Sequence, residues 1–130
     1  GNYVALNLIS KMKQKNIKIE GSKILIMGLT FKENCADTRN SGIQSVILRL
    51  KKKKCNVDLY DPWVDKKHFE EEYNFKITDD IENVKFDGII LAVSHDIFKK
   101  INLDEIKSSS KSIVYDVKGF FDFNHVTKRL

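Results

Sequence analysis

Continuous apolar runs alternate along this chain with segments whose apolar residues recur every three or four positions. Three runs have the length and composition of parallel strands buried on both faces: residues 23–28 (KILIMG), 88–93 (GIILAV) and 112–117 (SIVYDV). A further strand is predicted at residues 56–61 (NVDLYD), where Pro62 ends it because proline has no N–H to donate to the ladder. Residues 75–78 (FKIT) fit either a short strand or a loop.

Helical periodicity fills the intervals between these strands. It is clear at residues 3–15, 43–50 and 64–73, and the stretch 95–109 (HDIFKKINLDEIKSS) is also predicted to be helical. The last ten residues carry little signal. Alternating strands and helices joined by connections of crossover length favour right-handed βαβ units. The predicted fold is therefore a Rossmann-like α/β domain, an open parallel sheet with helices on both faces.

The first predicted helix has only Asn2 as a capping residue and an outer face rich in lysine, so it looks like the end of a longer, central helix. The predicted organisation is residues 1–20 as the end of that helix with a linker, and residues 21–130 as the domain itself. Cut from its upstream part, the helix is expected to expose an apolar stripe.

Composition narrows the class of protein. A length of 130 residues suits one domain, and 42% hydrophobic with 32% charged residues is typical of a globular chain. Cys35 and Cys55 lack a CxxC spacing, so both are expected to be reduced thiols. The first fifteen residues hold too short an apolar run for a signal core or a membrane span. We therefore expect a cytoplasmic protein with no membrane partner.

The net charge of +5 comes largely from Arg49 and Lys51 to Lys54. These cations lie late in a predicted helix, where they complement the carbonyl end of the helix dipole. An anionic partner is the alternative explanation. Nucleic-acid binding is not expected, because the run lacks interleaved aromatic residues and any recognition motif.

Candidate chemistry gathers in residues 28–41, GLTFKENCADTRNS, directly after the first strand. This turn is the usual phosphate site of an open α/β sheet, yet a dinucleotide cradle needs several glycines and only Gly28 is present. Lys32 and Arg39 could instead hold anions through their side chains. From residue chemistry alone, pairing of these cations with Glu33 or Asp37 is an equal alternative.

The motif GLTFKENCADTRNS resembles the C-terminal domain of the UDP-glucose/GDP-mannose dehydrogenase family. Further similar segments are LYDPWVD at 59–65, AVSHDIF at 92–98 and YDVKG at 115–119, while residues 2–12 resemble the end of the family's central helix. The form of the first motif is most similar to the UDP-N-acetylhexosamine 6-dehydrogenase branch. The resemblance covers nearly the whole chain.

The resemblance implies specific roles for several residues. Phe31 and Lys32 match a motif that contacts the nucleotide part of the UDP-sugar, and Lys118 matches a basic position that approaches the same substrate. Arg39 matches the arginine that reaches the pyrophosphate of NAD, and Asp37 is expected to orient it. NAD and UDP-sugar are thus the implied cofactor and substrate, and a homo-oligomer is the implied assembly.

The resemblance also implies what this chain lacks. The family oxidises the C6 alcohol of the sugar to a carboxylate through a cysteine that belongs to a motif upstream of the central helix, and neither Cys35 nor Cys55 matches it. No catalytic residue is therefore expected here, and the chain alone should bind ligand without turning it over. The implied role of the whole enzyme is the supply of uronic acid precursors for capsule or surface polysaccharide.

Structural roles are predicted for the other prominent polar residues. Asp61 could hold a ribose, but Pro62 follows it, so turn formation is favoured. His95 is expected to be a hydrogen-bonded turn residue, with general-base work as the minor alternative. His68 and the acidic run 70–72 lack ligand spacing, and no metal site is predicted.

A function of another class stays open beside the dehydrogenase hypothesis. The chain could be a stand-alone Rossmann-like module that binds an anion or nucleotide, or a regulatory domain. A phosphoacceptor receiver would need an acidic pair directly after the first strand, where this sequence has Gly28, Leu29 and Thr30.

Overall fold

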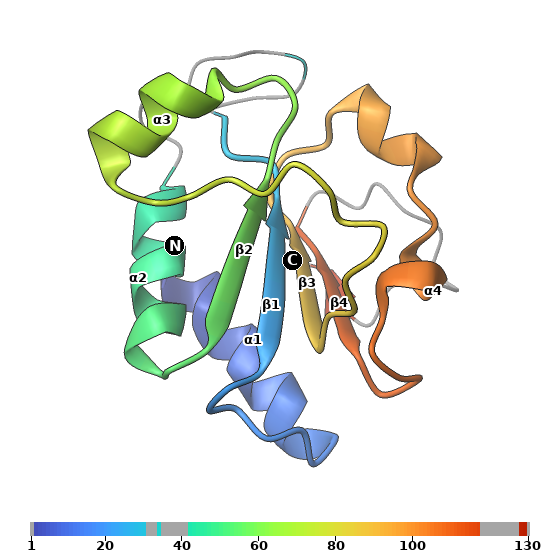
Figure 1. Cartoon of the computed structure of the whole chain (residues 1–130). Helices are drawn as coiled ribbons and strands as arrows, with labels where there is room; N and C mark the ends of the chain where they lie inside the picture. Colours follow the sequence, from blue (N-terminus) through green and yellow to red (C-terminus); the bar gives the residue numbers. More distant parts are fainter. Residues whose placement is uncertain (1, 31–33, 35–41, 118–127, 130) are drawn as a thin grey trace.

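A computed structural model describes residues 2–30, 34, 42–117 and 128–129 as a single five-stranded sheet with its helices (Figure 1). All neighbouring strands are parallel, in the order β2-β1-β3-β4-β5. The strands are β1 (Lys23–Met27), β2 (Asn56–Tyr60), β3 (Gly88–Leu91), β4 (Ile113–Asp116) and β5 (Lys128–Arg129). The parallel α/β architecture predicted from the sequence is confirmed.

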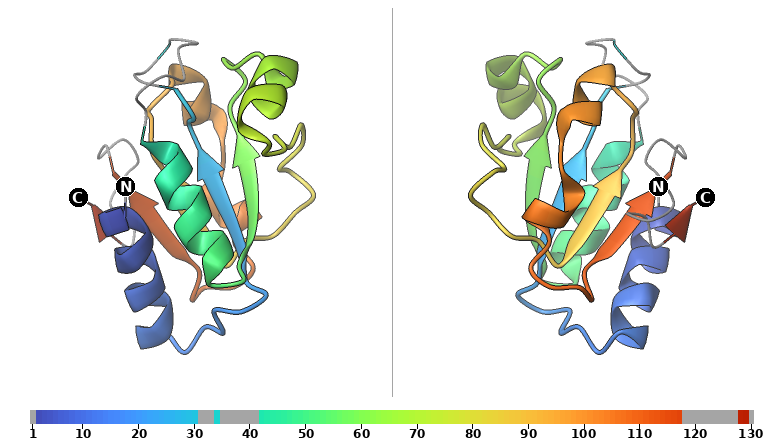
Figure 2. Two further views of the ribbon diagram at one scale, coloured as in Figure 1. Left: turned by 90° about the vertical axis from the view of Figure 1, so that its left-hand side faces the viewer. Right: turned by 90° about the vertical axis from the view of Figure 1, so that its right-hand side faces the viewer.

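Helices cover both faces of the sheet (Figure 2). One face carries α1 (Asn2–Gln14) and α2 (Ile43–Lys52), and the other carries the 3₁₀ helix η1 (Asp96–Lys100) and α4 (Leu103–Ile106). A further helix, α3 (Lys66–Tyr73), follows β2 beyond the carboxyl end of the sheet (Figure 1). Within the described residues, no helix is both long and apolar enough to span a bilayer.

Strict alternation along the strands divides the core into two layers. Ile24 and Ile26 of β1 pack with the layer under α1 and α2, whereas Leu25 and Met27 pack with the layer under η1 and α4. The central strands β1 and β3 are thus apolar on both sides. This explains why they read as continuous apolar runs in the sequence.

Two segments differ from the predictions, and residues 75–78 settle an alternative that the sequence left open. The stretch 95–109 is not one helix, because Asn102 accepts a hydrogen bond from the Asp104 amide (3.1 Å) and starts α4 as a separate turn after η1. Residues 75–78 contribute only an isolated bridge, between Ile77 and Leu59. The strand β5 was not predicted, so β4 is not the last strand of the sheet.

The helix α1 is packed into the domain. Its apolar stripe, Ala5, Leu8, Ile9 and Met12, is buried against α2 and β4. A Cβ on Gly88 of β3 would lie 3.2 Å from a methyl carbon of Leu8, so α1 sits close to the sheet. The expectation that α1 would expose this stripe is therefore wrong. The division into residues 1–20 and 21–130 stays a prediction.

The strand order places a topological switch point, the expected ligand crevice of such a sheet, between β1 and β3. After β1 the chain passes to β2 on one side and then crosses to β3 on the other, and ligands of open α/β sheets bind at such a switch point. Gly28 lies there with φ 95°, and a Cβ on it would be 2.7 Å from the Val93 nitrogen. The single glycine is thus required for close contact between the β1 and β3 loops.

Alanine at Gly28 should therefore destabilise the domain strongly. We expect the free energy of unfolding to fall by about 3 kcal/mol or more, because the positive φ and the overlap with Val93 both add strain. Gly42 is a matched control, since it also has positive φ (74°) but a Cβ on it would meet no atom of the described residues within 4 Å. Gly42→Ala should lose only about 1 kcal/mol. Equal losses in urea denaturation would contradict the role of Val93.

Candidate functional site

The carboxylate of Asp61 joins the carboxyl ends of three strands. It follows β2, and its Oδ2 accepts hydrogen bonds from the Leu29 amide after β1 (2.7 Å) and from Nε2 of His95 after β3 (2.9 Å). Its Oδ1 accepts from the Trp63 amide (2.8 Å), which makes the predicted turn. Asp61 is only 3% exposed, so these donors compensate for a carboxylate that has lost nearly all its water.

His95 is wholly buried and uses both ring nitrogens. Nδ1 accepts from the Asn34 amide (2.7 Å), and Nε2 lies within hydrogen-bond distance of Asp61 and of Oγ1 of Thr30 (3.2 Å). Its carbonyl accepts from the Phe98 amide, as expected of a turn residue at the start of η1. With no exposed nitrogen, His95 is unsuited to the alternative role of general base.

Asn34 ties the loop after β1 to the loop after β3. Besides the bond to His95, its side-chain amide donates to Oδ2 of Asp96 (3.2 Å), and its Oδ1 accepts from the Asp96 amide (3.0 Å). Its φ of 55° lies in the left-handed region, which asparagine tolerates better than most residues. The three hydrogen bonds thus hold this position of the loop against residues 95–96.

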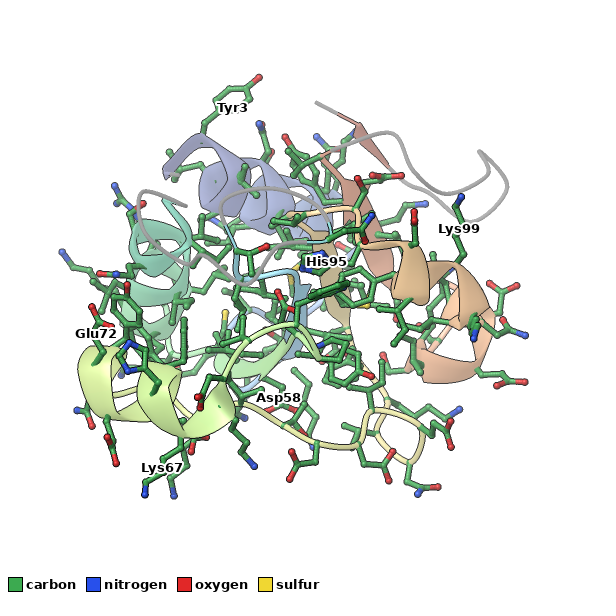
Figure 3. All side chains as sticks on the ribbon, turned by 90° about the horizontal axis from the view of Figure 1, so that it is seen from above. Tyr3, Asp58, Lys67, Glu72, His95 and Lys99 are labelled. Atoms are coloured by element: carbon green, nitrogen blue, oxygen red, sulfur yellow. The ribbon has the colours of Figure 1, made fainter. Side chains whose placement is uncertain are left out.

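An exposed apolar rim borders this network. Trp63 is 46% exposed and Ile97 is 44% exposed, and with Asn34, Pro62 and Asp96 they line a hollow of ≈ 610 Å³. The ring of Trp63 lies 6.1 Å from that of His95, centroid to centroid. Figure 3, viewed onto this end of the molecule, places His95 above the middle of the sheet. Trp63 therefore lies at the crevice rather than in the core.

Tyr60, the last residue of β2, directly precedes Asp61. Burial raises the pKa of Tyr60 above its ordinary value of 10.0, and the negative charge of Asp61 adds to the rise. A hydroxyl in that state can still donate a hydrogen bond at neutral pH.

The residues predicted to bind ligand lie outside the described residues. They are Phe31, Lys32, Asp37, Arg39 and Lys118, together with Cys35. Their described neighbours can be placed: Thr30 and Asn34 flank the Phe31–Lys32 pair, and Val117 follows β4 directly before Lys118. All three neighbours are at the carboxyl end of the sheet.

The described part of this rim is closely packed at Gly28 and at Asp61. The space that a Cβ on Gly28 would take is filled by the backbone of Val93. The carboxylate of Asp61, which stands where a ribose ligand is expected, is occupied by Leu29, Trp63 and His95. The expectation that the turn is not an ordinary NAD cradle concerns mainly residues 31–41, of which the structure describes Asn34 alone, and it stays a prediction.

Metal and thiol chemistry find little support in the described residues. No group of three or more His, Cys, Asp or Glu side chains gathers there to hold a metal ion. His68 instead pairs with Glu72 on the exposed face of α3 (2.9 Å). Cys55 is a buried free thiol near the amino end of β2, and its Sγ lies 3.6 Å from the Ile19 carbonyl.

Comparison with protein families identifies the domain. Residues 25–123 match the family "UDP-glucose/GDP-mannose dehydrogenase family, UDP binding domain". The chain belongs to this family. The crevice between β1 and β3 lies wholly within the matched residues.

Relatives in this family are similar along almost all of the chain. UDP-N-acetyl-D-glucosamine 6-dehydrogenase of Salmonella typhi is 42% identical over 91% of this chain. The enzyme of the same name from Pseudomonas aeruginosa is 36% identical over 100% of this chain. The structure titled UDP-D-ManNAc dehydrogenase from Pyrococcus horikoshii superposes with a TM-score of 0.75 at 26% identity, over 98% of the chain. The chain spans 28%, 31% and 29% of these proteins, respectively.

Sequence reasoning missed the connection between Asn34, Asp61 and His95. Each was visible as a polar residue after a predicted strand, and carboxyl ends of parallel strands meet at one edge. That signal could have placed them together in this family's crevice. It could not have shown that His95 is buried, because the burial depends on Trp63, Phe98 and the β1 loop packing around it.

Asparagine at position 61 should disrupt the network. Whichever way its amide turns, the NH₂ group faces either the Trp63 amide or both the Leu29 amide and His95, so buried donors lose their acceptor. We expect the free energy of unfolding to fall by about 2–3 kcal/mol. Asp65→Asn is the control, because Asp65 caps α3 at an exposed site and asparagine caps equally well. Chemical denaturation giving equal losses would contradict this role of Asp61.

Proposed function

We propose that this domain binds the UDP part of a UDP-sugar at the carboxyl end of its sheet. The observation that carries the proposal is the match to the family's UDP-binding domain, on a fold whose switch point lies between β1 and β3. The Asp61–His95 network supports the same location, because it holds Thr30 and Asn34 on either side of Phe31 and Lys32.

In this proposal, side chains rather than glycine amides neutralise the diphosphate. Lys32 provides a mobile ammonium group, Phe31 contacts the nucleotide, and Lys118 approaches from the end of β4. The composition of residues 28–41 supports this choice, since Gly28 is their only glycine and a dinucleotide cradle needs several. Arg39 extends toward the pyrophosphate of an NAD molecule held mainly by the rest of the protein.

The whole protein, in our proposal, is an NAD-dependent UDP-N-acetylhexosamine 6-dehydrogenase of the cytoplasm, acting as a homo-oligomer in capsule or surface polysaccharide synthesis. The names of the Salmonella and Pseudomonas relatives support the substrate class. The chain spans less than a third of these relatives, so the catalytic cysteine is assigned to another part of the protein. Cys55 is not assigned as the nucleophile, because its thiol is buried near the amino end of β2.

The nucleotide site can be tested directly by titration of this chain with UDP and UDP-N-acetylhexosamines. Trp63 is the only tryptophan and lies at the crevice, so ligand binding should change its fluorescence, and calorimetry should give the same weak affinity. NAD alone should scarcely bind. No fluorescence or heat response to UDP would contradict the proposed function.

Removal of the Lys32 ammonium group should weaken UDP binding by about tenfold or more, because a charge-assisted hydrogen bond contributes about 1.5–3 kcal/mol. Lys111→Ala is the matched control, since Lys111 is exposed just before β4 at the opposite end of the sheet. It should leave the dissociation constant unchanged. Equal UDP affinity of the wild type and Lys32→Ala would overturn the assignment of this loop.

A further inference from the structure

We propose that His95 is a positioning residue of the nucleotide site, held by Asp61 as the neutral tautomer protonated on Nε2. In this state its Nδ1 fixes the backbone of Asn34 and thereby the loop that carries Phe31 and Lys32. The inference rests on the proposed function for the identity of the ligand. His95 itself is fully buried and does not contact ligand.

The tautomer follows from the partners of the two ring nitrogens. A backbone amide can only donate, so the 2.7 Å contact from the Asn34 nitrogen requires a lone pair on Nδ1. The proton of the neutral ring is then on Nε2, which lies 2.9 Å from the acceptor Oδ2 of Asp61. Both hydrogen bonds are satisfied by this tautomer alone.

The other protonation states conflict with the same contacts. A ring protonated on Nδ1 alone would direct its N–H at the Asn34 N–H and leave Nε2 with no proton for Asp61. A doubly protonated ring would keep the bond to Asp61 but lose the one to Asn34. Asp61 therefore excludes the ring protonated on Nδ1 alone, and the Asn34 amide excludes the doubly protonated ring.

Asp61 is in turn oriented by two backbone amides. The Leu29 and Trp63 amides donate to its two oxygens, so the ends of β1 and β2 align the carboxylate that His95 contacts. The chain of contacts runs from these strand ends through Asp61 and His95 to Asn34. Orientation of a histidine by a carboxylate on its other nitrogen is a recurrent way to choose its tautomer.

His95 contacts two positions of the loop after β1, Thr30 and Asn34. Thr30 contacts Nε2 of His95, and Asn34 contacts Nδ1 and also Asp96. Phe31, Lys32 and Glu33 are the three residues between these positions. A ligand group that needs Lys32 at a particular place therefore benefits when His95 has pre-oriented both ends of the segment, since less ordering remains for binding.

Two substitutions separate the two hydrogen bonds of His95. The amide of glutamine reaches the position of Nε2, so His95→Gln keeps a donor for Asp61 and loses the acceptor for Asn34. The amide of asparagine reaches the position of Nδ1, so His95→Asn keeps an acceptor for Asn34 and loses the donor to Asp61. A purely structural role would lower stability in both variants without separating their UDP affinities.

We expect His95→Gln to weaken UDP binding about tenfold, the effect of one lost hydrogen bond. His95→Asn should bind UDP with most of the wild-type affinity. His68→Gln is the control, because His68 is exposed on α3 and pairs only with Glu72 among the contacts described. Calorimetry on variants shown to be folded by circular dichroism gives the comparison. Equal affinities of the Gln and Asn variants, or a Gln variant equal to the wild type, would overturn the proposal.

A second measurement on the wild-type chain does not depend on the variants folding or on UDP. Long-range ¹H–¹⁵N spectra should show His95 as the tautomer protonated on Nε2 near neutral pH, with the Asn34 amide protected from exchange. A ring protonated on Nδ1 would overturn the inference even if UDP binds. Failure of the wild type to bind UDP, with the expected tautomer present, would instead contradict the proposed function and remove the ligand role given to His95.

Discussion

The arrangement of the crevice depends on the burial of one carboxylate. Asp61 lies at the end of β2 with almost no contact with water, and an unpaired charge in that place would be strongly unfavourable. Donors from the ends of β1, β2 and β3 compensate for the lost hydration. Since each donor comes from a different strand end, satisfying the charge also brings those ends into one geometry.

The loop after β1 differs from a dinucleotide cradle in its glycine content. In a cradle, glycines leave room for a pyrophosphate against backbone amides. Here Gly28 leaves room for the backbone of Val93, and Asp61 is used for internal hydrogen bonds. In the proposed function, the anion meets the lysine and arginine side chains of the loop after β1 instead.

Helix α1, which the sequence analysis assigned to a central helix outside the domain, completes the apolar core of the domain. Its side chains cover β4 and α2, and Asn7 lies within hydrogen-bond distance of the Tyr115 hydroxyl (3.4 Å). Tyr115 is fully buried beneath it. The domain thus depends on α1 for part of its apolar layer.

The sequence by itself determined the alternation of strands and helices, the parallel sheet and the position of the loop after β1. These properties depend on local periodicity, which apolar runs such as 23–28 and 88–93 express within a few residues. Only the tertiary structure decided that residues 95–109 break into two short helices, that β5 joins the sheet, and that Asn34, Asp61 and His95 form one network. The members of that network are 27 and 34 residues apart along the chain, so no local pattern encodes their hydrogen bonds. Those bonds exist because packing excludes water from the carboxyl end of the sheet, where each buried polar group needs a partner from another strand.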